Sequence, residues 1–274
     1  MTGFYSKLRK ILLAACIVIT VCALCGCGKN TRKEKELRKQ AIGFMEQGDY
    51  SAAVARFDEA LSYKDGKYGS LEIDILRYRA EAEVLAGEYA NAANTYAQLA
   101  REDGEKPEYL NLEVICMVRG NQSLSKALDL YRHSCELDPH GTGNREALYA
   151  LGTALSRSGD EQNVQIAKEL YEQALNSEEG ATGEIYNRIG SLVFEQGDID
   201  GAIDWFQKGI DFIQNHPELN EQDVLISLKY NTAICYEYKQ DYKTAKALFE
   251  EFAQQYGSNE VIEHEIAFLE SRIR

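Results

Sequence analysis

The side chains that could perform chemistry are four histidines, seven cysteines and 44 acidic residues in a chain of 274. No pair of histidines has the HExxH spacing, or another spacing at which two imidazoles hold one metal ion on a helix. The chain also has no G-x-S-x-G nucleophile turn, no Walker-type glycine loop and no dinucleotide fingerprint. Neighbouring carboxylates such as Glu250 and Glu251 are typical of a solvated acidic helix. We therefore expect no enzymatic activity, no cofactor and no metal.

The cysteines fall into two groups, four in the first 27 residues and three in the rest of the chain. The later three are Cys116, Cys135 and Cys235, an odd number without CxxC spacing, which argues against a disulfide framework or a zinc site. Two readings stay open. Cys116 and Cys135 fall on the two helices of one predicted repeat, so they could form a single bridge in an oxidising compartment, or all three could be small buried thiols.

The N-terminal segment has the pattern of an export signal. Three cations precede an apolar and small-residue run over residues 11–24. That run is too short to cross a hydrocarbon core of ~30 Å as a helix, which needs about 20 residues, and it has the length of a signal-peptide hydrophobic region. It ends in Leu24-Cys25-Gly26-Cys27, which resembles the lipobox of bacterial lipoproteins.

This resemblance implies cleavage after Gly26 and a diacylglycerol group on Cys27. Two or more acyl chains give stable anchoring, so we expect a protein bound to the extracytoplasmic face of the cell membrane without spanning it. Gly28, the second mature residue, leaves export to an outer membrane open. An uncleaved anchor helix is the alternative. We expect residues 1–26 to be the signal peptide and residues 27–33 a tether.

The chain is acidic, with a formal charge of -14. Residues 1–26 contain three cations and no acidic residue, so the mature chain carries -17. Such a body repels phosphate backbones, and nucleic-acid binding is not expected. One basic run, residues 29–39, lies beside the predicted lipid site. It could face anionic headgroups, or it could be a solvated linker leading into the first helix.

One pattern recurs six times along the chain: an alanine, then an aromatic residue four positions later, which places both on one face of a helix. Aromatic residues make up 10% of the chain, so six matches in six are not a product of composition. A small residue stands upstream in five units, and Ile115 takes that place in the third. A turn such as Gly48-Asp49-Tyr50 separates the two helices. The pairs are Ala53/Phe57, Ala92/Tyr96, Ala127/Tyr131, Ala167/Tyr171, Ala202/Phe206 and Ala245/Phe249; the upstream small residues are Ala41, Ala80, Gly152, Gly190 and Ala233.

These residues resemble the tetratricopeptide repeat, a 34-residue helix-turn-helix unit, over residues 34–257. The resemblance implies an all-α fold, a right-handed α-solenoid of about six helical hairpins. Residues 258–274 carry apolar positions from Val261 to Ile273 among charged ones, the pattern of a C-terminal capping helix. About three extra residues lie between the helices of the fourth unit. Phe252, at a usually small position, either loosens its helix pair or fills space against the cap.

In tetratricopeptide solenoids the first helix of each hairpin lines a concave groove where peptides dock. Tyr149, Asn187 and Tyr230 occupy one place in three successive units, although the tyrosines could instead pack between repeats. A chaperone-type carboxylate clamp is not expected, since Ile42 stands where that clamp has asparagine. The groove residues that the resemblance implies are Arg38, Arg77, Tyr149, Arg157, Asn187, Phe194, Tyr230 and Tyr238.

The leading hypothesis is a non-catalytic, lipid-anchored scaffold that binds a protein or peptide at the cell envelope through this groove. One alternative is a lipoprotein of outer-membrane or cell-wall assembly, which rests on likeness of architecture alone. Another is a lipoprotein that binds a solute or glycan on aromatic platforms in the groove.

Overall fold

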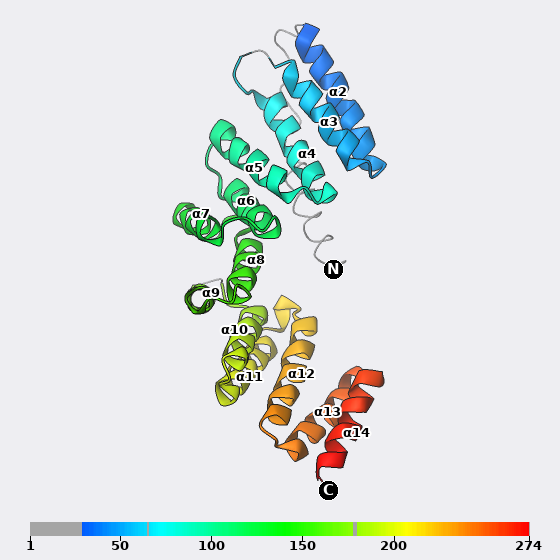
Figure 1. Ribbon diagram of the computed structural model, residues 1–274, viewed down its shortest axis with the longest axis vertical. Coiled ribbons are helices and arrows are strands. Elements are labelled where there is room, and N and C mark those ends of the chain that lie inside the picture. Colours follow the sequence, from blue (N-terminus) through cyan, green and yellow to red (C-terminus); the bar gives the residue numbers. More distant parts are fainter. Residues whose placement is uncertain (1–28, 65, 178–179, 274) are drawn as a thin grey trace. The chain divides into compact units, whose positions relative to one another are not determined.

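The computed structural model describes residues 29–64, 66–177 and 180–273 (Figure 1). These residues form thirteen α-helices and one 3-10 helix, with no strand among them, which confirms the all-α prediction. The predicted signal and lipid-bearing Cys27 lie outside the described residues. No described helix is both long and apolar enough to cross a membrane.

The described residues form two compact units, one up to residue 147 and one from residue 148, with the boundary inside α8 (Asn144–Ser156). In the first unit each helix packs against the next along the chain, as expected of stacked hairpins. The hairpins of this unit are α2 (Lys29–Glu46) with α3 (Tyr50–Ser62), α4 (Ser70–Ala86) with α5 (Tyr89–Asp103), and α6 (Pro107–Arg119) with α7 (Leu124–Leu137).

The second unit continues the same alternation and confirms the predicted α-solenoid of six hairpins and a cap. Here α10 packs against both α9 and α12, so successive hairpins stack on one another. Its elements after α8 are α9 (Glu161–Leu175), α10 (Gly183–Glu195), α11 (Ile199–Asn215), the 3-10 helix η1 (Pro217–Leu219), α12 (Gln222–Tyr238), α13 (Tyr242–Tyr256) and α14 (Glu260–Ile273).

The first helix begins earlier than expected from the sequence. Residues 29–33, assigned there to a tether, form the first turns of α2. Lysine, arginine and glutamate are good helix formers, and Leu37 and Ala41 bury the same helix against α3, so the basic run folds instead of linking.

Most of the second helices start with the same cap. An N-cap side chain accepts a hydrogen bond from a backbone N–H of the first turn, which satisfies a donor that has no partner inside the helix. In four of these turns the residue directly before the N-cap has positive φ, for example 86° at Gly197 and 62° at Gln240 in the equivalent place; in the third hairpin it is Asn121, two residues before Ser123. The N-cap residues are Asp49, Ser123, Asp160, Asp198 and Asp241.

The crossings within the hairpins explain the recurring pattern. All six alanines and all six aromatic residues of the pattern are buried. A Cβ added at Gly190 would lie 2.4 Å from the ring of Phe206, and one at Gly152 would lie 2.3 Å from the Tyr171 hydroxyl. In these two hairpins the aromatic side chain therefore occupies the space that a side chain at the small position would need.

The extra residues of the fourth hairpin lengthen a helix, which corrects their expected place in the turn. The pattern alanine is the fourth residue of α3, α5, α7, α11 and α13, whereas Ala167 is the seventh of α9. Asp160 caps α9 through the backbone N–H groups of Gln162 and Asn163, so the helix begins directly after the turn. The insertion adds almost one turn at the start of α9.

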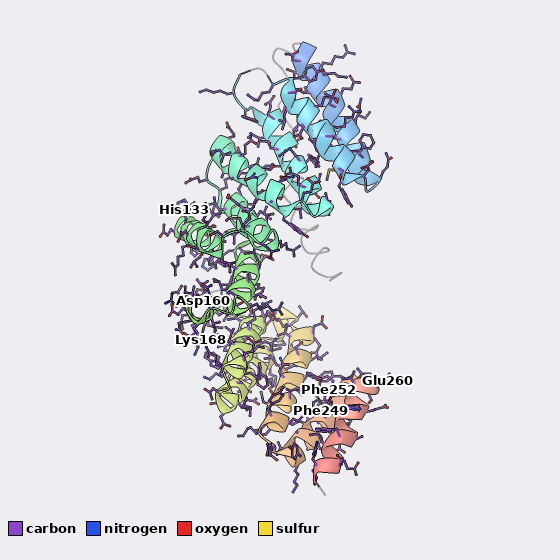
Figure 2. All side chains as sticks on the ribbon, in the orientation of Figure 1. His133, Asp160, Lys168, Phe249, Phe252 and Glu260 are labelled. Carbon is purple, nitrogen blue, oxygen red and sulfur yellow. The ribbon has the colours of Figure 1, made fainter. Side chains whose placement is uncertain are left out.

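The capping helix α14 packs on the sixth hairpin. Ile262 and Leu269 are buried in a cluster with Phe249, and Phe252 packs against the same cluster (Figure 2). Phe252 thus fills space against the cap, the second of the two expected outcomes. Val261 and Ile273 remain 57% and 46% exposed, so they do not join the apolar side as expected, because α14 packs on α13 with one face only.

The crossing geometry predicts the effect of a single methyl group. Gly190→Ala should lower the free energy of unfolding by about 1–3 kcal/mol, because its Cβ overpacks the contact with Phe206. Gly43→Ala is the matched control in α2, where a Cβ meets nothing within 4 Å; it should stabilise by about 0.5–1 kcal/mol. Urea unfolding of both variants makes the comparison. Equal effects would contradict the close crossing.

Candidate partner-binding surface

The two predicted groove residues of the first unit are engaged by their neighbours. Arg38 forms an ion pair with Asp74, and its guanidinium lies 5.0 Å from the ring centre of Tyr78. Arg77 donates through Nε to the Tyr109 hydroxyl at 2.8 Å. These contacts join α2 to α4 and α4 to α6.

Arg77 also belongs to a polar cluster at the start of α6. Its Nη2 lies 3.2 Å from a carboxylate oxygen of Asp103, to which Tyr109 and Lys106 donate hydrogen bonds. Burial alone would raise the pKa of Asp103, but the hydrogen bonds from Lys106 and Tyr109 lower it overall. The cluster is thus a paired, charged contact between hairpins, and its groups already have partners inside the chain.

The second unit contains a depression of about 200 Å³ between α8 and α10. It brings together Arg157 and Asn187, two of the residues predicted from the repeat pattern. Tyr171, the buried aromatic of the fourth hairpin, forms part of its wall. The full lining is Thr153, Ser156, Arg157, Tyr171, Glu184, Asn187, Arg188, Ser191, Leu192 and Glu195.

Arg188 organises this pocket, and sequence reasoning missed it. Its guanidinium donates to the Thr153 hydroxyl and pairs with Glu184 at 2.8 Å. The same group lies 4.5 Å from the ring centre of Tyr149, a cation–π contact. Its Nε is buried and has no hydrogen-bond partner within the described part of the chain. The one available signal was Glu184, four residues before Arg188 on α10.

Tyr149 joins α8 to α10. Its hydroxyl lies 2.8 Å from that of Thr182, the residue that caps α10 through the backbone N–H of Ile185. Burial raises the pKa of the Tyr171 hydroxyl, although the charge of the neighbouring Arg188 acts in the opposite direction. Tyr149 and Tyr171 therefore both serve the packing around the pocket.

Asn187 and Tyr230 connect the next hairpin. The Asn187 side-chain oxygen accepts a hydrogen bond from Asn231 at 2.8 Å, while its amide nitrogen has no partner among the described residues. The Tyr230 ring packs edge-on against Phe249 and Phe252, with centroid distances of 5.6 and 6.0 Å. Burial raises the pKa of Tyr230. Its role in binding stays a prediction beside this packing role.

Phe194 and Tyr238 form an aromatic pair across α10 and α12. Their rings meet edge to face with centroids 4.8 Å apart. Tyr238 is 65% exposed, so the outer ring of the pair is open to a ligand.

Two charged groups of the pocket are available for contacts with a ligand. The side chains of Arg157 and Glu195 are exposed, and neither side chain forms an ion pair or hydrogen bond with another described residue. With the Asn187 amide, they offer an opposite pair of charges and a hydrogen-bond donor at one opening. This set can hold polar groups of a polypeptide. Within residues 29–273, as far as they are described, no group of three His, Cys, Asp or Glu side chains could hold a metal ion.

The three cysteines outside the N-terminal segment are free thiols, so the Cys116–Cys135 bridge that stayed open is not formed. Cys135 accepts a hydrogen bond from Asn144 at 3.1 Å. Burial raises the pKa of Cys116 to about 12 and that of Cys235 to about 11. Neither thiol is a nucleophile at neutral pH, because the thiolate is the reactive form.

Comparison with known families supports the repeat assignment. A tetratricopeptide repeat model matches residues 38–107 and 149–217, more than half of the chain. A second tetratricopeptide repeat model matches residues 228–259. No curated protein matches the chain.

Solved structures resemble most of the chain at low sequence identity. The C-terminal part of a TPR repeat-containing protein from Cytophaga hutchinsonii has a TM-score of 0.61 at 14% identity, over 97% of this chain and 95% of that one. The apo quorum sensor NprR from B. thuringiensis scores 0.55 at 10% identity, over 98% and 75%. PilW, a type IV pilus biogenesis factor, scores 0.52 at 16% identity, over 86% and 97%. At these identities the likeness shows the fold alone.

The contacts around the pocket assign different roles to its two arginines: Arg188 positions its neighbours, whereas Arg157 is open to a ligand. Arg188→Met should lower the free energy of unfolding by about 1–3 kcal/mol, because Glu184 and Thr153 lose their partner. Arg157→Met, the same change at an exposed position, should stay within about 0.5 kcal/mol of the parent. Chemical denaturation measures both. Equal losses would contradict the assignment of Arg188 as the organising group.

Proposed function

The chain belongs to the tetratricopeptide repeat family, and from that premise we propose that it is a non-catalytic scaffold for a protein or peptide partner. The proposed site is the face of α8, α10 and α12. A tetratricopeptide scaffold is suited to protein–protein interaction. The proposal goes further in two respects: it names the face of this chain that binds the partner, and it assigns the chain to the cell envelope.

The pocket between α8 and α10 is the observation that carries the proposal. Arginine and tyrosine are the residue types that contribute most to binding energy at protein interfaces, and here Arg157 and Tyr238 are both exposed. The contacts of Arg188 with Thr153 and Glu184 hold the pocket in place before a ligand arrives. Pre-organisation of this kind reduces the entropy lost on binding.

The size of the pocket favours a polypeptide over a free solute. About 200 Å³ lies below the roughly 300–1,000 Å³ that is usual for small-molecule sites, and the lining is largely polar. A cavity of this volume fits one side chain of a longer ligand that also contacts the Phe194–Tyr238 pair. These features make binding of a solute or glycan the weaker candidate.

We also propose that the protein is held on the extracytoplasmic face of a membrane by lipid on Cys27. The support is the sequence pattern, a cationic segment, an apolar run and a cysteine preceded by Gly26. Labelling with a radioactive fatty acid in cells should mark the parent and leave Cys27→Ser unlabelled. Equal labelling of both forms would contradict the anchor.

Capture of the partner tests the proposed face. Chain 28–274 would be incubated with detergent-solubilised envelope, beside Arg157→Ala/Tyr238→Ala. Both side chains are exposed, so the double variant should fold as the parent does. The amount of partner that it captures should fall by at least about tenfold. Lys243→Ala/Leu219→Ala is the control, since it removes an exposed cation and an exposed apolar side chain from other elements of the same unit.

The control should capture the partner as the parent does. Equal capture by the Arg157/Tyr238 variant would place the site elsewhere on the chain. A parent that captures nothing, even after chemical cross-linking, would contradict the scaffold function.

A further inference from the structure

The first helix is a cationic element in an acidic chain. Helix α2 carries six lysine or arginine residues and three glutamates over 18 positions, whereas the whole chain has a formal charge of -14. Charge of the opposite sign to the rest of a protein, concentrated on one helix, indicates an electrostatic contact with a surface.

Three cations of α2 are exposed and have no ion pair with a described residue: Arg32, Lys35 and Lys39. They are three and four positions apart, so they form one strip along the helix. The opposite side carries Leu37 and Ala41, which are buried in the core with α3. The cationic strip therefore faces solvent on the side of α2 away from this core.

Two other cations of the helix, Arg38 and Lys33, are already paired. Arg38 forms its ion pair with Asp74 of α4, on the packed side. Lys33 lies 3.7 Å from Glu36, which also accepts a hydrogen bond from Gln40. The strip is thus the part of α2 whose positive charge is not compensated locally.

The place of α2 in the chain indicates the surface that this strip meets. The helix begins at Lys29, two residues after Cys27. A chain spans at most about 3.6 Å per residue, so the start of α2 lies within about 7 Å of the residue proposed to carry lipid. This step rests on the proposed anchor.

We propose that the strip of Arg32, Lys35 and Lys39 lies on anionic lipid headgroups and is a second membrane contact beside the acyl chains. Each cation near an anionic surface raises the partition coefficient by a factor of about five. The acidity of the other helices does not cancel this attraction. A helix with its side chains is about 10 Å across, which is about one Debye length at 0.1 M salt.

A singly acylated form of the protein brings this contact into a measurable range. Chain 28–274 contains every described helix, and its first residue, Gly28, can be myristoylated. One myristoyl chain binds vesicles with only about 10⁴ M⁻¹, so a headgroup contact adds visibly to the affinity. Partition would be measured on phosphatidylcholine vesicles with and without phosphatidylglycerol, at low and high NaCl.

The parent should bind the phosphatidylglycerol vesicles up to about 100-fold more tightly at low salt, because three cations contribute about fivefold each. Arg32→Gln/Lys35→Gln/Lys39→Gln should lose most of this preference. The control, Arg101→Gln/Lys126→Gln/Arg132→Gln, removes the same charge from exposed positions on α5 and α7 and should keep the preference.

Two results would overturn the inference. One is equal binding of the parent to both kinds of vesicle. The strip would then contact an acidic protein surface instead of lipid headgroups. The other is an equal loss in the control, which would mean that net charge alone matters. The proposed anchor fails separately, through the labelling of Cys27 in cells, because here the acyl chain is attached by design.

Discussion

The close crossing of the two helices in each hairpin is the constraint on which the rest of the structure depends. At Gly152 and Gly190 there is no room even for a methyl group, because Tyr171 and Phe206 fill the space above the glycine. A side chain there would push the helices apart and change how the first helix of the hairpin is presented. In the second unit those first helices are α8, α10 and α12, which carry the candidate binding face.

Tyr171 links this packing to the proposed site. One side of its ring covers Gly152, and the side chain also forms part of the pocket wall. Beside it, Arg188 extends from α10 to Thr153 and to the ring of Tyr149 on α8, so two hairpins share one polar network. Because Thr153, Glu184 and the Tyr149 ring all contact the Arg188 guanidinium, its position is restricted before a ligand binds, which is what a pre-formed binding pocket needs. The same residues therefore stabilise the stack and shape its surface.

The sequence predicted the hairpins and their crossings because both depend on local spacing. Helical periodicity and turn residues placed all six alanine–aromatic pairs. The role of Arg188 was not accessible, since it depends on which side chains of α8 and α10 meet in space. The three extra residues before Ala167 could extend either the turn or the helix, and the Asp160 cap selects the helix. The basic run from Lys29 resembled a linker by charge, whereas packing at Leu37 makes it a helix.

Photo-cross-linking from the pocket in intact membranes is the most direct test of the central claim, that the α8–α10–α12 face holds a polypeptide. A photoreactive amino acid would replace Arg157 in one variant and Gln207 of α11, an exposed residue outside the pocket lining, in another. The account predicts a discrete protein adduct from position 157 and none from position 207. Adducts of equal yield from both positions, or from position 207 alone, would contradict it.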